Sequence, residues 1–268
     1  MKKSLYFMLI IFISSFNVIA QDKIDVMRYE YEVMFKPSVK DADSVYTEKM
    51  YLDVWANQSR FSSESKSKLI EFLAEEKNSM FRGEMFFPPG VAATRLDWTV
   101  IREGQKVYVV SKVGASLMKM ESSLKEIKWD ILPEIEEYEG MKVQKAIGEL
   151  RGRIWTVWFT TEIDLIEGPY KFKNLPGFVV KAVDDKADYL FEFRKSEKVQ
   201  TVSRYFGYED AMLVDAKRML KAREIASNKT RKQVLSERGI TIHVEPNSES
   251  EANLNSRVGD DTNHIEKL

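Results

Sequence analysis

The stretch Met27-Arg-Tyr-Glu-Tyr-Glu-Val-Met-Phe35 alternates apolar and charged residues over most of its length. Its odd-numbered residues are apolar or aromatic and would share one face of an extended chain. Arg28, Glu30 and Glu32 would share the other face. A period of two is typical of a β-strand with one buried side. The stretch therefore predicts a half-buried strand, and similar segments elsewhere predict the rest of the fold.

Short segments of the same kind recur along the chain. Gly104 with Gln105 predicts one hairpin turn, and the polar residues 184–186 predict another. Residues 134–139 predict an acidic loop, and Pro176-Gly177 predicts the centre of a type II turn. We expect an α+β protein built on a curved, antiparallel, half-barrel-like β-sheet. Its further strands are predicted at residues 46–56, 94–102, 106–112, 117–122, 127–132, 141–150, 153–163, 178–183 and 189–193.

Two segments change to the period of a helix. Residues 63–77 predict one short helix, with Ser63 or Ser65 as its N-cap. Residues 207–238 predict a long amphipathic helix that is rich in lysine and arginine on its outer side. Such a helix packs on the sheet or meets a membrane or a partner helix, and we favour packing on the sheet. Its apolar face would hold Met212, Ala216, Met219, Ala222 and Ala226.

The chain divides into four parts on this interpretation. A signal peptide takes residues 1–20, and a β-rich domain takes residues 21–206. The amphipathic helix follows over residues 207–238. Residues 239–268 are mostly polar, and we expect them to be a disordered tail.

The N-terminus has the three regions of a secretory signal. Lys2 and Lys3 precede the apolar run Leu5 to Phe16, and small residues end at Ala20 before Gln21. The run is shorter than the roughly 20 residues that span a bilayer, which favours cleavage near Ala20-Gln21 over an uncleaved anchor. We expect an exported, soluble protein in the periplasm or outside the cell, with no transmembrane anchor in the mature chain.

Charge and composition exclude several classes of function. Loss of residues 1–20 takes two lysines from the 41 basic residues, leaving 39 against 42 acidic ones and a net charge of −3. Nucleic-acid binding would want a basic excess, so it is not expected. The chain has no cysteine, and its 15 Phe, 11 Tyr and 5 Trp must supply a core without disulfides.

Candidate catalytic groups are few. The two histidines, His243 and His264, both lie beyond the predicted β-rich domain. Nucleophilic Ser-His or Cys-His sites and zinc sites are therefore not expected, and we predict a non-enzyme without cofactor or metal. Glu162 and Asp164 flank Ile163 and would share a strand face, which suits acid–base chemistry or, more commonly, a solvated surface.

A group of cationic and aromatic residues is the first candidate binding site. Arg151 and Arg153 bracket a glycine and precede Trp155 and Trp158. A guanidinium beside aromatic rings can hold a carboxylate or phosphate group. The alternative, which we favour, is that each arginine fixes a neighbouring carbonyl or acid of its own chain.

The sequence from residue 168 onward resembles a known family. It reads Gly-Pro-Tyr-Lys-Phe-Lys-Asn-Leu-Pro-Gly and continues into the apolar run Phe178 to Val180. This is similar to the signature of the GLPGLI family of exported Bacteroidetes proteins, and residues 143–160 also resemble its pattern. Asn174 replaces the first glycine of that signature, and asparagine tolerates positive φ. The motif residues are Gly168, Pro169, Tyr170, Lys171, Phe172, Leu175, Pro176 and Gly177.

The resemblance implies a type of protein without naming a reaction, because the family has no assigned activity. The motif itself predicts architecture, since its prolines fix φ and its glycines permit tight turns. Tyr170, Phe172 and Leu175 then either plug the end of the curved sheet or line its mouth as a binding site. We favour the plug.

Three functions remain open. The first is a non-catalytic binding or chaperone-like module for an apolar or amphiphilic ligand, because a half-barrel leaves a concave apolar face. The second is a protein-interaction accessory of outer-membrane, TonB-dependent machinery, which predicts an exposed patch on the C-terminal helix. The third is a carboxylate-based hydrolase, which predicts that Glu162 and Asp164 face a cleft.

Overall fold

The computed structural model describes residues 23–41, 43–75, 91, 93–114, 116–203, 205, 207–237, 239–257 and 262–266. The predicted signal peptide lies outside these residues. Within them, no helix combines the length and the apolar character needed to cross a membrane.

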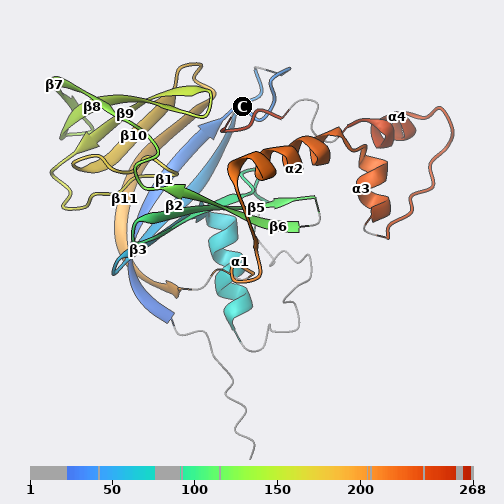
Figure 1. Cartoon of the computed structure of the whole chain (residues 1–268), viewed down its shortest axis with the longest axis horizontal. Coiled ribbons are helices and arrows are strands. Elements are labelled where there is room, and N and C mark those ends of the chain that lie inside the picture. Colours follow the sequence, from blue (N-terminus) through green and yellow to red (C-terminus); the bar gives the residue numbers. More distant parts are fainter. Residues whose placement is uncertain are drawn as a thin grey trace, which may run out of the picture.

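The chain is mostly β-structure and forms a single twelve-stranded sheet that is open and strongly curved (Figure 1). All neighbouring strands are antiparallel except β12 and β6, which pair in parallel. The strand order is β12-β6-β5-β4-β3-β2-β1-β11-β10-β9-β8-β7. The strands are β1 (Lys23–Phe35), β2 (Tyr46–Trp55), β3 (Gln58–Ser63), β4 (Trp98–Glu103), β5 (Lys106–Val113), β6 (Ser116–Ser123), β7 (Asp130–Tyr138), β8 (Met141–Leu150), β9 (Arg153–Thr160), β10 (Phe178–Asp184), β11 (Tyr189–Val202) and β12 (Met212–Val214).

Strand β1 lies at the centre of the sheet and confirms the alternation predicted from the sequence. It pairs with β2 on one side and with β11 on the other. Tyr29, Tyr31, Val33 and Phe35 are all buried on the concave face. Both predicted hairpin turns also form, and Gly104 adopts the positive φ of 60° that its turn requires.

The loop between β9 and β10, which carries the Gly-Pro-Tyr-Lys-Phe motif, fills the concave face. Phe172 is fully buried, with its ring 4.5 Å from that of Trp155. Tyr170 packs edge-on against Trp98 of β4 at 4.8 Å. The loop therefore joins the two ends of the sheet through one aromatic core, which is the plug arrangement expected for Tyr170, Phe172 and Leu175.

The glycines of this motif serve close packing. Gly177 does not adopt a positive φ, so the predicted type II turn at Pro176-Gly177 is wrong. A Cβ on Gly177 would collide with the backbone oxygen of Thr160, and one on Gly168 would collide with that of Phe172. Asn174 does take a positive φ of 62°, as its substitution for glycine predicted.

Helix α1 (Glu64–Ala74) covers the outer face of the sheet and confirms the predicted short helix. Ser63 is its N-cap and accepts a hydrogen bond from the amide of Lys66. Glu71 reaches Arg28 and Thr201, which lie on the face opposite the aromatic core. The curved sheet is thus packed on its outer side by α1 and on its inner side by the motif loop.

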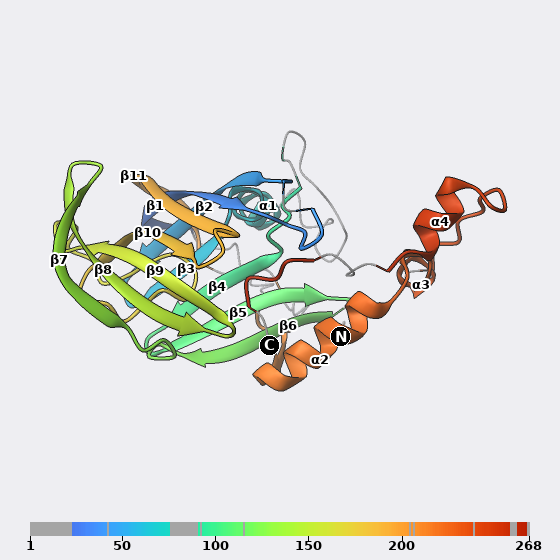
Figure 2. The same ribbon diagram turned by 90° about the horizontal axis from the view of Figure 1, so that it is seen from above.

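The predicted long helix over residues 207–238 is wrong. The segment begins with a turn and β12, and α2 (Ala216–Asn228) starts only after its N-cap Asp215. Lys229 is the C-cap of α2, and a second helix, α3 (Arg231–Glu237), begins at the reciprocal capping box formed by Thr230 and Gln233. Figure 2 shows α2 running along the sheet while α3 stands away from it.

Two further expectations are corrected. Residues 134–139 are not an acidic loop, because β7 extends to Tyr138 as the edge strand of the sheet and only Glu139 lies in the turn that follows. Charged side chains suit such an edge, since they discourage pairing with another sheet. The tail beyond residue 238 is ordered in its described parts, with α4 (Glu249–Asn255) and a buried segment at Thr262–Glu266.

Candidate functional site

A cavity of about 770 Å³ lies where the ends of β1, β2, β4 and β5 meet α2 and the C-terminal segment. Its volume is that of a pocket for a small organic molecule. The wall is partly apolar and partly cationic, and it is built from elements far apart in the sequence. The lining residues that bear on its chemistry are Phe35, Tyr46, Arg95, Leu96, Asp97, Trp98, Lys112, Val113, Tyr189, Arg223 and residues 262–265.

Aromatic rings make the apolar wall. The ring of Phe35 lies 6.2 Å from that of Tyr46 and stacks at 6.1 Å on that of Tyr189. Trp98 and Leu96 extend this wall toward the motif loop, and Ile265 closes it from the other side. Alternation along β1 produces this surface, because Phe35 is the last of its inward-facing residues.

Three cations face the cavity without an acidic partner. The guanidinium of Arg95 lies 3.9 Å from the ring centre of Tyr46. Arg223 of α2 donates to the hydroxyl of Ser111 at 3.4 Å. Among the described residues neither arginine, nor Lys112, pairs with a carboxylate. The cavity therefore has a surplus of positive charge.

The other charges of the lining are neutralised. Asp97 pairs with Lys66 at 2.9 Å, and Lys229 pairs with Glu237 at 2.7 Å. Burial raises the pKa of Tyr189, so its hydroxyl stays protonated and acts as a donor. Burial, with Arg223 and Arg153 nearby, lowers the pKa of His264, so this histidine is neutral at pH 7.

The C-terminal segment Thr262–Glu266 forms one side of this cavity. Thr262 bridges to Ser38, and Asn263 and Glu266 are buried. His264, expected beyond the folded domain, accepts a hydrogen bond on its carbonyl from Arg153 at 2.8 Å. No pattern of apolar residues in the sequence pointed to this segment, because only Ile265 in it is apolar.

The two arginines of the predicted site are both engaged by acids of their own chain, as the favoured alternative expected. Arg153 is buried and pairs with Asp184 and with Asp188, the latter at 2.9 Å. Arg151 lies in the β8–β9 turn and pairs with Glu126 at 2.6 Å. Each also contacts the C-terminal segment, which sequence reasoning did not connect with them.

The predicted aromatic residues divide between the core and the surface. Trp155, Tyr170, Phe172 and Leu175 are buried in the core and are absent from the cavity lining. Trp158 is half-buried, with the ammonium of Lys181 lying 5.4 Å from its ring centre. None of the predicted site residues lines the cavity, so sequence reasoning missed its wall, although the alternation of β1 marked Phe35 as sharing the apolar face.

Glu162 and Asp164 lie in a bend after β9 and are exposed. Glu162 accepts a hydrogen bond from the backbone amide of Lys142 at 3.1 Å. Neither residue lines the cavity described above. The described residues also hold no cluster of three metal-binding side chains.

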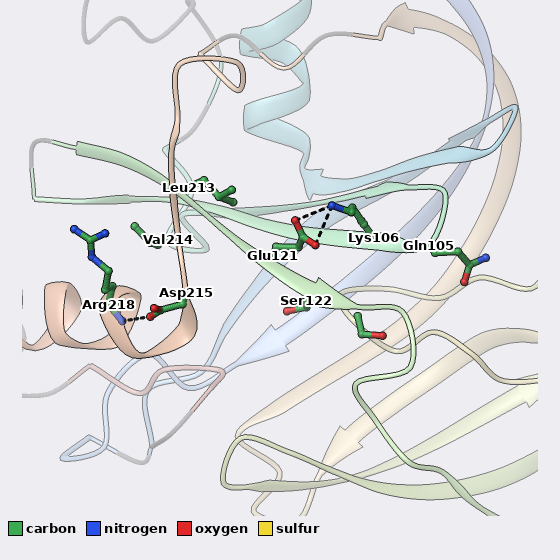
Figure 3. Close-up of a pocket in the computed structure, with 9 residues that line it drawn as sticks. Gln105, Lys106, Glu121, Ser122, Leu213, Val214, Asp215 and Arg218 are labelled. Atoms are coloured by element: carbon green, nitrogen blue, oxygen red, sulfur yellow. Dashed lines mark hydrogen bonds and ion pairs between the residues drawn. The ribbon is translucent and has the colours of Figure 1, made fainter.

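A second hollow, shown in Figure 3, lies between β6, β12 and the start of α2. Its volume is about 680 Å³, and its charged groups are mostly satisfied. Lys106 and Glu121 point toward each other and pair at 3.1 Å. Asp215 caps α2 by accepting from the amide of Arg218 at 2.7 Å. The larger cavity, with unpaired cations beside aromatic rings, is the better candidate.

Comparison with known proteins shows a relationship of fold. No protein-family model matches the chain, and no curated protein matches it. Two crystal structures of PNGF-II, in C2 and P21 space groups, are similar with TM-scores of 0.52 and 0.53 at 13% identity. The match covers 77% of this chain and 34% of PNGF-II, so the chain corresponds to about a third of that protein's length.

Proposed function

We propose that this chain is a non-catalytic binding module for an anionic amphiphile. The apolar body of the ligand would lie against Phe35, Tyr46 and Trp98, and its anionic group would meet Arg223 and Arg95. The observation that supports this proposal is the combination of an aromatic wall with cations that have no carboxylate partner among the described residues. A guanidinium gains a charge-assisted hydrogen bond when an anion enters the cavity.

We further propose that the protein is an exported member of the GLPGLI family, processed near Ala20-Gln21. The signature at residues 168–177 supports the family, and the N-terminal pattern supports export. Detection of the mature chain beginning at Gln21 in the envelope or medium of its host would test export. A chain that keeps residues 1–20 would contradict it.

Binding is tested with two probes that differ in charge, dodecanoate and dodecanol. Titration calorimetry on mature protein should show dodecanoate binding, and dodecanol binding should be at least tenfold weaker. Arg223→Gln should weaken dodecanoate about tenfold, whereas Arg218→Gln, on the same helix outside this cavity, should not. Absence of binding, equal binding of both probes or equal loss in the two variants would contradict the proposal.

A second candidate is an interaction partner for outer-membrane, TonB-dependent machinery. The favouring observation is exposed apolar residues on and after α2, namely Ile225, Ile240 and Ile242 at 52%, 47% and 44% exposure. Photo-crosslinkers placed at Ile225 and Ile240 in the native host should join one and the same receptor, and a crosslinker at exposed Ile154 of β9 should not. Scattered products at all three positions would argue against this role.

A further inference from the structure

The segment Thr262–Glu266 contacts the rest of the protein as a bound peptide contacts its receptor. Its backbone and side chains meet groups from β9, β11, the motif loop and the residues that follow β1. The described part of the preceding chain, residues 239–257, is exposed or half-buried. Figure 2 shows α3 and α4 standing away from the sheet. The segment is thus a short docked piece after an arm that lies outside the core.

Asn263 is the most fully bonded residue of the segment. Its amide N–H donates to the carbonyl of Pro37 at 2.8 Å, and its side-chain nitrogen donates to that of Lys36 at 3.0 Å. Arg153 donates to its side-chain oxygen at 2.5 Å, and the Tyr189 hydroxyl donates to its carbonyl at 2.5 Å. The oxygen and the nitrogen of the side-chain amide and both backbone polar groups are therefore hydrogen-bonded. This arrangement selects asparagine at this position.

Glu266 anchors the other end. Its carboxylate accepts from the Tyr170 hydroxyl at 2.7 Å and pairs with Lys171 at 2.6 Å. The guanidinium of Arg151 lies 3.3 Å away. Between the two anchors, Ile265 is 4% exposed and belongs to the main apolar cluster. The site therefore recognises asparagine, then an apolar residue two positions later, then a carboxylate.

The receptor groups keep acidic partners when the segment is absent. Arg153 would retain Asp184 and Asp188. Arg151 and Lys171 would both retain Glu126, at 2.6 and 2.9 Å. Departure of Glu266 into water leaves each of these cations in contact with at least one acid, which reduces the usual large cost of breaking a buried ion pair. These retained contacts lower the cost of an empty site.

We propose that these residues form an exchangeable peptide-binding site for an extended Asn-x-apolar-acidic segment, with this chain's own Thr262–Glu266 as the resident occupant. A free peptide of the same sequence replaces it once the covalent tether is cut. The tether matters because a linked segment has a high effective concentration and competes well against free peptide. This site is separate from the amphiphile cavity in its recognition chemistry, although residues 262–265 of its occupant also line that cavity.

The test uses the full mature chain with a protease site inserted after Thr241, an exposed position. After cleavage the C-terminal fragment should co-elute with the body at high concentration. A labelled peptide, residues 261–268, should then displace it, with the binding followed by fluorescence anisotropy. Circular dichroism and tryptophan fluorescence report whether the body stays folded.

Peptide variants test recognition without altering the receptor. The Asn263→Ala and Glu266→Gln peptides should each bind at least tenfold more weakly, and a scrambled peptide should not bind. Glu249→Gln in the fragment, an exposed carboxylate outside the site, should leave its co-elution unchanged.

Three outcomes would overturn the proposal. A fragment that excess peptide fails to replace would be an integral part of the fold. Equal binding of the parent and Glu266→Gln peptides would show that the site does not recognise the Glu266 carboxylate. Unfolding of the body on release of the fragment would show that the segment is a core element and not a ligand.

Discussion

Two buried carboxylates, Glu167 and Glu266, hold the motif loop in similar ways and differ in one respect. Each is at most 3% exposed. Glu167 pairs with Lys173 and Arg102, and Glu266 pairs with Lys171 and Arg151. The motif loop supplies Lys173 to the Glu167 cluster and Lys171 to the Glu266 cluster.

The difference lies in what each cation keeps when its carboxylate is removed. Arg151 and Lys171 also meet Glu126, whereas among the described residues Lys173 and Arg102 pair with Glu167 alone. Burial lowers the pKa of Lys173 in spite of the opposing effect of Glu167. A buried carboxylate is therefore structural when it is the only counter-charge of its cations. It can serve docking when a second carboxylate contacts the same cations.

The largest effect should come from Glu167→Gln. It leaves Lys173 and Arg102 buried without a counter-charge, so we expect a loss of about 3–5 kcal/mol in unfolding free energy. Urea unfolding at pH 7 measures it, with exposed Glu162→Gln as the matched control. A loss close to that of the control would show that Glu167 is not the sole compensation.

Acid should weaken the Glu167 cluster next. Burial alone would raise the pKa of Glu167, but Lys173 and Arg102 bring it below its ordinary value. A carboxyl with a depressed folded-state pKa contributes stability above its unfolded pKa, near 4.3, and loses it as pH falls through the folded pKa. Urea midpoints between pH 7 and 2.5 should therefore fall less steeply in Glu167→Gln. Parallel curves would contradict this assignment.

Gly177→Ala should disturb the motif loop by steric overlap. Its Cβ would meet the backbone of Thr160, which is part of β9 and cannot move alone, so we expect a loss of about 1–3 kcal/mol. Gly140→Ala serves as the control, since its Cβ would meet nothing within 4 Å and only its positive φ adds a cost of roughly 1 kcal/mol. If Gly177→Ala costs no more than the control, close packing is not its role.

The smallest effect on global unfolding should come from Glu266→Gln in the intact chain. Glu126 still contacts both Arg151 and Lys171 and compensates one of their two charges, so we expect a loss of about 1 kcal/mol. The same urea experiment measures it. A loss as large as that of Glu167→Gln would erase the distinction between the two carboxylates.

The sheet could be predicted because its information is local. The alternation in β1 indicates which face is buried, and the turn residues indicate where the hairpins lie. Both patterns can be seen within a few positions of the sequence. The acidic residues of β7 misled for a physical reason. An edge strand needs few buried side chains, so its composition resembles that of a loop.

The C-terminal region could be predicted only in part. The capping box at Thr230 and Gln233 was present in the sequence and marks the break between α2 and α3. The docking of Asn263 on Arg153 joins residues 110 positions apart, and no local pattern reports such a contact. The cavity wall likewise comes from five strands, two helices and the C-terminal segment, so its residues become a site only after folding.

Native-state hydrogen exchange tests the central claim most directly, by comparing one amide from each cluster. The Asn263 amide donates to Pro37 at 2.8 Å, and the Val179 amide donates to the Glu167 carbonyl at 2.9 Å. We predict that Asn263 exchanges through a local opening that is insensitive to low urea, with a lower free energy than Val179. Equal free energies with the same urea dependence would show that the segment unfolds only with the whole protein, and would contradict a docked, exchangeable occupant.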